Sequence, residues 1–281
     1  MEAILSNRSA CTMMSINVQS LNAHASDIAT DHVLNAVDLL ALSETWMDDG
    51  TSVAIAGYDC IVQQKRHATR AGGVAIYQKI GASEIAVAHD IQQLSASRDA
   101  LVGAADQYGD ICAVETSIMG TRALLFALYL SPDTTLKQKK CFFARNLLSY
   151  HYFRSPMPIV VTGDFNIDVS KSENNELIAF MSQYLQLELA TDRAQATTLG
   201  GTCLDLTFHR NIQVECTRYI SYFSYHRPML SVLSMPDDCV KKNDASSSTT
   251  RSVPKSSSSQ PPKQPSTLST SRVDFPVHHT T

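Results

Sequence analysis

The chain has 281 residues, 44% of them hydrophobic, which is enough to bury the core of one large α/β domain or two small ones. Its net charge of −4 divides into +4 for residues 241–281 and −8 for the rest, which excludes attachment to nucleic acid through a broad basic surface. No segment reaches the roughly 18 consecutive apolar residues of a membrane span, and residues 1–10 lack the apolar core of a signal peptide. We therefore expect an intracellular protein, in the nucleus or the cytoplasm, with no membrane partner.

Short apolar runs rich in β-branched residues alternate with polar loops, and a few longer stretches have helical spacing. The expected strands are 13–18, 38–43, 58–63, 73–78, 111–118, 123–130, 158–162, 204–209 and 219–223. The expected helices are 26–36, 136–154 and 174–184, the first with Ser26 and Asp27 as its capping signal. Many strands and few helices in mixed order predict two packed sheets flanked by helices, an α/β sandwich.

Composition divides the chain into three parts. Residues 1–10 form a short extension, residues 11–235 the folded domain, and residues 236–281 a tail rich in Ser, Thr, Pro and Gln. Such a tail buries too little apolar surface to offset chain entropy, so we expect it to be disordered, as a linker in preference to a partner-binding arm. The seven cysteines occur singly and in odd number, which predicts neither disulfides nor structural zinc.

The segment MPIVVTGDFNID carries the clearest chemical signal. An apolar strand ends at Gly163 and delivers Asp164 and Asn166 into a turn. Side chains two residues apart at a strand end can point into one cleft, where Asp164 would orient or deprotonate a water and Asn166 would hydrogen-bond the reacting group. Gly-Asp and Asn also form ordinary turns, so this segment alone leaves the two interpretations even.

Isolated polar residues at other strand ends favour the catalytic interpretation. They are of the kinds that metal-assisted phosphoryl chemistry uses, namely Asn17, Glu44, Tyr129, Asp205 and His226. The Glu44 carboxylate suits Mg²⁺, which takes few protein ligands and keeps several waters. Asp205, inside an apolar strand, is costly to bury without a partner, and His226 would be that partner.

Each of these residues has an alternative interpretation. Asn17 could be a turn former, Glu44 a helix-start residue before Trp46, and Tyr129 a core aromatic with its hydroxyl at the surface. The order of the whole set along the chain decides between the catalytic and the structural interpretation.

Taken in order, Asn17, Glu44, Tyr129, the GDFN segment, Asp205 and the triplet ending at His226 resemble the motif series of the endonuclease/exonuclease/phosphatase family. The likeness covers about residues 11–235, and the endonuclease domains of LINE-type retrotransposons are the most similar members. The resemblance implies a four-layered αββα sandwich of two mixed sheets, with one active site at the ends of the sheets.

The resemblance also implies roles for the residues. Glu44 would bind Mg²⁺, or alternatively Mn²⁺, with help from Asn17, while Asp164 would activate water and Asn166 would hold the water or the phosphate. His226, oriented by Asp205, would contact the scissile phosphate, and Tyr129 would lie beside the phosphate or the leaving group. The implied activity is metal-dependent hydrolysis of phosphodiester bonds by a monomeric endonuclease, with DNA preferred over RNA as substrate.

One position departs from the family pattern. The usual Ser-Asp-His triplet reads Ser224, Tyr225, His226 here, so a carboxylate near the metal is replaced by a phenol. Metal affinity and rate are therefore in question. A catalytically weakened nucleic-acid-binding descendant is one alternative, and a phosphoesterase acting on inositol phosphates or lipids is another.

Overall fold

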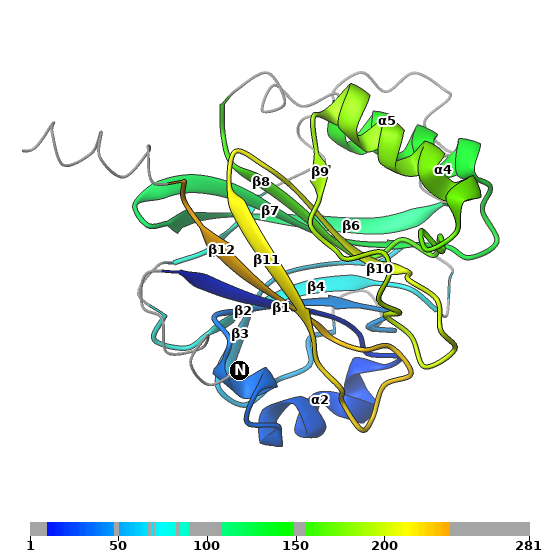
Figure 1. The fold of residues 1–281 in the computed structure, drawn as a ribbon. Coiled ribbons are helices and arrows are strands. Elements are labelled where there is room, and N and C mark those ends of the chain that lie inside the picture. The colour runs from blue at the N-terminus through cyan, green and yellow to red at the C-terminus, as the bar shows by residue number, and fades with distance from the viewer. Residues whose placement is uncertain are drawn as a thin grey trace, which may run out of the picture.

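The computed structural model describes residues 10–47, 51–66, 69, 71–82, 85–89, 108–148 and 156–236. Two six-stranded sheets pack face to face, and helices cover their outer faces (Figure 1). The first sheet has the order β11-β12-β1-β2-β4-β3 and the second the order β5-β6-β7-β8-β10-β9. The predicted four-layered sandwich is confirmed.

The strands of the first sheet are β1 (Cys11–Asn17), β2 (Leu39–Ser43), β3 (Tyr58–Gln64), β4 (Val74–Lys79), β11 (Gln213–Arg218) and β12 (Met229–Ser234). Those of the second are β5 (Val87–His89), β6 (Gly109–Ile118), β7 (Thr121–Leu130), β8 (Ile159–Asp164), β9 (Glu188–Leu189) and β10 (Asp205–Arg210). The helical segments are α2 (Leu21–Thr30), η1 (Leu34–Ala36), α4 (Leu136–Phe143), η3 (Ala144–Leu148), η5 (Ser172–Asn174) and α5 (Asn175–Leu185).

Each sheet contains one parallel pair joined by a helical crossover, as parallel strands require. In the first sheet the pair is β1 and β2, joined through α2, and in the second it is β7 and β8, joined through α4. In Figure 1, α2 lies below the first sheet, and α4 and α5 lie above the second. The other strand pairs of the two sheets are antiparallel, so both sheets are mixed.

Three apolar layers separate these four layers of secondary structure. One lies between α2 and the first sheet, one between the sheets, and one between the second sheet and the pair α4 and α5. Strand β7 contributes to two of them, because Phe126 and Leu128 face the helices while Leu125 and Ala127 face the other sheet. Strands buried on both faces read as continuous apolar runs, which explains the sequence ALLFAL.

Eight of the nine predicted strands are present with small shifts at their ends, and the predicted strand 219–223 is wrong. Those residues form a loop in which Tyr219 donates to Asp31 Oδ2 at 2.8 Å and Phe223 stacks on His24. Strands β11 and β12, which flank this loop, were not predicted. The aromatic run had the composition of a strand, but it covers the α2 side of the first sheet instead.

The predicted helix 26–36 also needs correction. Helix α2 begins at Leu21 and ends at Thr30, so Ser26 and Asp27 lie inside it and do not cap it. Asp31 breaks the segment, since its Oδ1 accepts the amides of Val33 at 2.9 Å and Leu34 at 3.1 Å and starts η1.

The helix predicted at 136–154 is present over residues 136–148, and residues 149–155 lie outside the described part of the chain. The predicted helix 174–184 matches α5 to within one residue. Residues 1–9 and the predicted tail from 237 onward also lie outside the described residues.

None of the helices that the structure describes is long and apolar enough to cross a membrane. The described cysteines are free thiols, as their single spacing predicted.

Candidate active site

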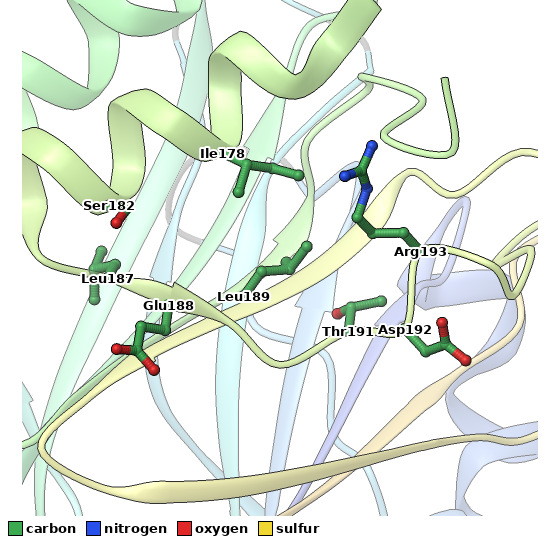
Figure 2. A pocket seen from close by; sticks show the side chains of 8 residues that line it. All are labelled: Ile178, Ser182, Leu187, Glu188, Leu189, Thr191, Asp192 and Arg193. Atoms are coloured by element: carbon green, nitrogen blue, oxygen red, sulfur yellow. The ribbon is translucent and has the colours of Figure 1, made fainter. Parts of the chain in front are cut away.

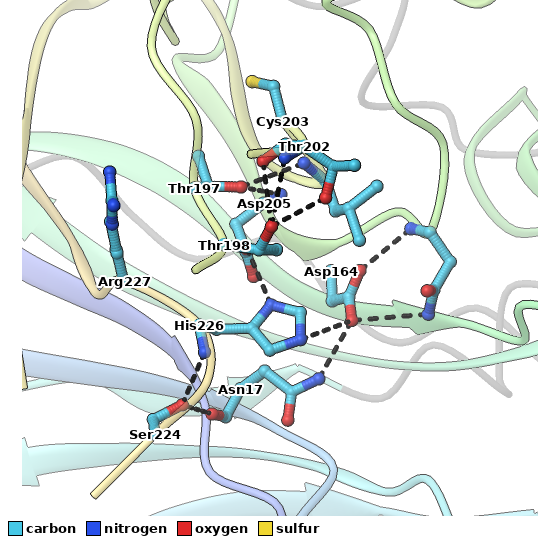
Figure 3. Close-up of polar contacts among 12 residues, drawn as sticks. Asn17, Asp164, Thr197, Thr198, Thr202, Cys203, Asp205, Ser224, His226 and Arg227 are labelled. Atoms are coloured by element: carbon cyan, nitrogen blue, oxygen red, sulfur yellow. Dashed lines mark hydrogen bonds and ion pairs between the residues drawn. The ribbon is translucent and has the colours of Figure 1, made fainter. Parts of the chain in front are cut away.

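Polar side chains from both sheets meet at one edge of the sandwich. Strand β1 ends at Asn17 and Glu44 follows its parallel neighbour β2, while Tyr129 of β7 is the register partner of Asp164 in β8. The carboxyl ends of parallel neighbours lie at the same sheet edge, and face-to-face packing joins the two edges. Asn17 Nδ2 donates to Glu44 Oε1 at 2.8 Å. It also donates to Asp164 Oδ2 at 2.9 Å, which links the two sheets (Figure 3).

Burial and backbone conformation make this cluster costly to build. Asn17 and Asp164 are fully buried, and Glu44 is half-buried. Glu44 has a φ of 51°, a left-handed conformation that costs a non-glycine residue free energy and occurs preferentially at functional sites. Its carbonyl accepts the amide of Ser20 at 2.9 Å, which ties the turn after β2 to the start of α2.

The GDFN turn is determined by close packing against β7. Gly163 has a φ of 139°, and a Cβ added there would come within 1.9 Å of the Leu128 carbonyl oxygen, so only glycine fits. Asn166 adopts the left-handed region at φ 48°, which asparagine tolerates. Its backbone N–H donates to Asp164 Oδ1 at 2.9 Å. The Asn166 side chain donates to the Leu130 carbonyl at 2.8 Å. The side-chain amide of Asn166 thus fixes the turn to the end of β7 and also faces the polar cluster.

A buried lysine supports the same turn from the helix side. Lys139 of α4 is 1% exposed, and its Nζ donates to the carbonyls of Phe165 at 3.1 Å and Asn166 at 2.6 Å. Burial lowers the pKa of Lys139 to about 8, although the charge of Asp164 opposes that shift. The spacing of Lys139 with Phe142 and Phe143, three and four residues on, places it on the buried face of α4 and could have identified it from the sequence.

His226 lies between two carboxylates. Its Nδ1 is 2.9 Å from Asp205 Oδ2 and its Nε2 is 4.0 Å from Asp164 Oδ2 (Figure 3). Asp205 and Asp164 are direct register partners of the antiparallel strands β10 and β8, so the pairing of these two strands sets the spacing of the carboxylates. The structure therefore brings together the two residues whose pairing was expected on grounds of burial.

Two hydroxyl groups fix the backbone of His226 and of its partner Asp205. Ser224 Oγ donates to the Asn17 carbonyl at 2.7 Å and accepts the His226 amide at 3.0 Å. Thr197 Oγ1 accepts the amides of Leu204 at 2.9 Å and Asp205 at 3.0 Å. Ser224 belongs to the expected triplet, whereas Thr197 lies in a Thr-Thr pair that carries no signal in the sequence.

Charge and burial shift the pKa values within this cluster. Burial disfavours the imidazolium form of His226, but the hydrogen bond to Asp205 and the negative charges of Asp205, Asp164 and Glu44 outweigh it and raise the pKa to about 9. Burial and repulsion by Asp205 raise the pKa of Asp164 to about 7, against the opposing influence of His226 and of two hydrogen bonds. The two carboxylates therefore favour the protonated imidazole, and burial favours the neutral form of Asp164.

Tyr129 contributes a phenol that stays protonated. Burial, followed by the charges of Glu44 and Asp164, raises its pKa well above the usual range. The guanidinium of Arg66 lies 5.7 Å from the centre of its ring, and the Arg66 Nε is 3.2 Å from Asp110 Oδ1. Arg66, which was not singled out in the sequence, places a positive charge beside this edge of the site.

Tyr225, which replaces the carboxylate of the family triplet, points toward a neighbouring turn. Its side chain is 46% exposed, and its hydroxyl occupies the space where a Cβ on Gly200 would lie, 2.0 Å away. The Tyr225 ring packs edge-on against the His226 ring with centroids 5.8 Å apart. The phenol oxygen thus lies over Gly200, which has no side chain to displace it.

Two overlapping groups of side chains in this cluster could hold a divalent cation. Asn17, Glu44 and Asp164 offer oxygen ligands, which hard cations such as Mg²⁺ prefer. Asp164, Asp205 and His226 also have ligand atoms within 4.8 Å of one another. A protonated imidazole has no lone pair for a metal and itself places positive charge between the two carboxylates. The oxygen atoms of Glu44 and Asn17 are therefore candidate ligands for a hard divalent cation.

The chain belongs to the endonuclease/exonuclease/phosphatase family, whose model matches residues 14–226. Enzymes of this family are hydrolases acting on phosphoester bonds and are generally divalent-metal-dependent. No curated protein sequence matches the chain.

Solved structures of low sequence identity share the fold. The endonuclease domain of TRAS1, a telomere-specific non-LTR retrotransposon, is 14% identical with a TM-score of 0.59, over 80% of this chain and 99% of that one. The human Nocturnin catalytic domain with a bound sulfate anion is 14% identical with a TM-score of 0.56, over 82% and 95%. The 3′ phosphatase NExo from Neisseria, bound to a product DNA hairpin, is 18% identical with a TM-score of 0.51, over 79% and 98%.

A separate cleft of about 500 Å³ lies between α5 and the segment around β9, and Figure 2 shows its side chains. Ile178, Leu187 and Leu189 form its apolar part, and Arg193 lies at one end, bonded to the Val169 carbonyl at 2.8 Å. None of the candidate active-site residues lines this cleft. The cleft is therefore a feature separate from the candidate active site at the sheet edge.

Proposed function

We propose that this chain is a metal-dependent phosphodiesterase of the retrotransposon-derived type that cleaves DNA as an endonuclease. The observation that carries the proposal is the position of His226 between Asp205 and Asp164, with Asn17 joining Asp164 to Glu44. This arrangement combines a carboxylate that can take a proton, a cation that can bind a phosphate and an oxygen-rich metal site within a single cluster.

Asp164 and Asn166 act on the nucleophile. Asp164, with its pKa raised to about 7, accepts a proton from a water that attacks the phosphorus. The backbone amide of Asn166 donates to Asp164 Oδ1 and restrains the carboxylate during that transfer. The bond from phosphorus to the 3′ oxygen breaks, the departing oxygen takes a proton from solvent water, and the products carry a 5′ phosphate and a 3′ hydroxyl.

His226 and Tyr129 act on the phosphate. The Nε2–H of the His226 imidazolium donates a hydrogen bond to a nonbridging oxygen, where negative charge develops, and Asp205 keeps the ring oriented and charged through Nδ1. Tyr129 stays protonated and donates a hydrogen bond to the phosphate or the leaving oxygen. Glu44 and Asn17 would hold Mg²⁺, or alternatively Mn²⁺, and the chemistry supplied there is neutralisation of the charge on the departing oxygen.

Two of the structural relatives support DNA as the substrate class. TRAS1 is described as a retrotransposon endonuclease, and NExo is seen with a DNA hairpin. A catalytically weakened nucleic-acid-binding descendant is the second candidate, because Tyr225 stands where the family has a carboxylate.

The test is the conversion of supercoiled plasmid to open circles by the intact chain in Mg²⁺, with EDTA as the metal-free control. We expect nicking that EDTA abolishes. DNA binding without nicking would favour the weakened descendant. Hydrolysis of a phosphoinositide or of sphingomyelin without action on DNA would overturn the choice of substrate.

A further inference from the structure

Two arginines outside the proposed catalytic set converge on a single backbone carbonyl. Arg218 ends strand β11, and Arg227 directly follows His226. Their Nη1 atoms both point at the Ala196 carbonyl oxygen, at 2.9 Å from Arg218 and 3.4 Å from Arg227. Both side chains are half-buried. Two full positive charges thus share the partial negative charge of one peptide group.

No carboxylate neutralises this pair within the described part of the chain. Other arginines there do form ion pairs, for example Arg66 with Asp110 and Arg122 with Glu115, whereas Arg218 and Arg227 form none. The Nε atoms of Arg218 and Arg227 are also buried without a hydrogen-bond partner. Two guanidinium groups held together with unused buried donors repel each other, and an anion placed between them would remove that cost.

The arginine pair lies next to the active site but does not face its centre. Ala196 directly precedes Thr197, whose hydroxyl holds the Asp205 amide, and the Arg227 amide donates to the Thr197 carbonyl at 2.7 Å. Figure 3 shows the Arg227 side chain extending away from Asp164, on the other side of His226. An anion bound by the pair is therefore a neighbour of the group that His226 contacts, and not that group itself.

We propose that Arg218 and Arg227 form a second anion subsite, which binds a backbone phosphate of the substrate strand beside the scissile phosphate. The inference rests on the proposed function, because a strand that places one phosphate at His226 carries further phosphates on either side. Guanidinium groups match the oxygens of a phosphate through paired hydrogen bonds. A local pair of this kind gives a chain with a charge of −8 before residue 241 a means to hold a polyanion.

The test is the salt dependence of DNA binding, measured by fluorescence anisotropy on a labelled oligonucleotide duplex in EDTA so that no hydrolysis occurs. The variants are Arg218→Gln, Arg227→Gln and the double variant. Arg122→Gln is the matched control, because Arg122 is exposed, paired with Glu115 and located at the opposite end of β7 from Tyr129. Each subsite variant is expected to weaken binding by about tenfold and to reduce the slope of log K against log salt by about 1.

Further measurements separate a phosphate subsite from a structural role. Replacing both arginines by lysine should keep the salt slope and lose part of the affinity, since charge is retained without the paired geometry. In the nicking assay, Arg227→Gln should raise KM and leave kcat within about threefold. Gln variants that lower the melting temperature but bind DNA with the affinity and salt slope of the parent would overturn the inference.

The outcomes also distinguish this inference from the proposed function. A parent chain that does not nick DNA, but whose binding depends on Arg218 and Arg227 as expected, contradicts the proposed catalysis and supports the subsite. A parent chain that nicks DNA with a KM unchanged by the Gln variants supports the catalysis and contradicts the subsite. Absence of any DNA binding by the parent contradicts both.

Discussion

His226 has two different carboxylate neighbours, and its two ring nitrogens serve different purposes. Nδ1 bonds Asp205 at 2.9 Å, which fixes the orientation of the ring, while Nε2 faces Asp164 and the space in which a phosphate would bind. This division resembles the general arrangement in which a buried carboxylate orients a histidine for chemistry at its other nitrogen. In the proposed mechanism Asp205 is therefore a positioning residue that acts through His226.

Replacing Asp205 by asparagine tests that role. The asparagine side chain keeps the shape but loses the charge that holds His226 protonated, so the pKa of His226 should fall from about 9. We expect plasmid nicking to slow by roughly 10²- to 10⁴-fold. NMR titration of the His226 ring measures the pKa directly, and an unchanged midpoint in Asp205→Asn would contradict the assigned pairing.

Tyr225→Asp tests the consequence of the departure from the family triplet. Tyr225 is half-exposed with its hydroxyl over Gly200, so a shorter side chain can be placed without disturbing the core. An added carboxylate beside His226 should strengthen cation binding and reduce by about tenfold the Mg²⁺ concentration that gives half-maximal nicking. Tyr225→Asn is the control of equal size without charge, and an equal effect of both variants would show that charge is not the cause.

The members of the cluster could be identified from the sequence because carboxylates and amides at the ends of apolar strands cost free energy to bury, and therefore stand out as candidates for a function. Asn17, Glu44, Asp164 and Asp205 all have this context, and the structure brings them to one edge. Supporting residues such as Thr197 gave no signal, because a threonine that accepts two backbone amides looks in sequence like any threonine in a loop. Their role depends on contacts between segments that are distant along the chain.

At the scale of elements, the turn after β8 depends on a contact with the neighbouring strand. Strands β7 and β8 run parallel with Leu128 opposite Gly163, and the Leu128 carbonyl oxygen occupies the space that a Cβ on Gly163 would need. The glycine is thus required by packing and by its φ of 139°, independently of any catalytic role.

Gly163→Ala should therefore damage both fold and site. The methyl group forces β8 away from β7 directly before Asp164, and we expect a loss of more than about 3 kcal/mol of unfolding free energy together with loss of nicking. Urea unfolding measures the first effect. Gly120→Ala is a matched control, because Gly120 has positive φ but a Cβ added there would meet no heavy atom within 4 Å, so it should cost much less. Equal losses in the two variants would contradict the packing account.

Lys139 gives α4 a pH-dependent contribution to stability. Its pKa is about 8 in the folded chain and 10.5 when unperturbed, so between these values the unfolded chain binds the proton and the folded chain does not. Stability should therefore rise with pH across that window. Relative to Lys139→Met, the parent should gain on the order of 1 to 3 kcal/mol between pH 7.5 and 10, measured by urea unfolding. A constant difference between the two proteins would show that the pKa is not lowered by folding.

The strands buried on both faces were predictable from their apolar runs, but the edge of the first sheet was not. Strand β11 alternates exposed and half-buried residues and contains Glu215 and Arg218, so its composition is that of a loop. The loop from Tyr219 to Phe223 is rich in aromatic residues because it covers α2. Strand composition does not by itself set strand pairing, and here the aromatic segment is a loop while the polar, partly exposed segment is the edge strand.

At the scale of the whole molecule, the site exists only where the two sheets meet. Asn17 of the first sheet donates to Asp164 of the second. Ser224, in the loop between β11 and β12, donates to the Asn17 carbonyl and accepts the His226 amide. Residues 1–240 carry a net charge of −8, so the proposed binding of a polyanion would depend on local positive groups at this junction. The geometry of the candidate site therefore depends on the packing of the two sheets.

The most direct test of this account is the initial rate of plasmid nicking in Mg²⁺ by the parent chain, by Asp164→Ala and by His226→Ala. The account predicts metal-dependent nicking by the parent and a loss of at least about 10²-fold in each variant, with DNA binding retained. Nicking by either variant at the rate of the parent would contradict the assignment of the active site to this edge of the sandwich.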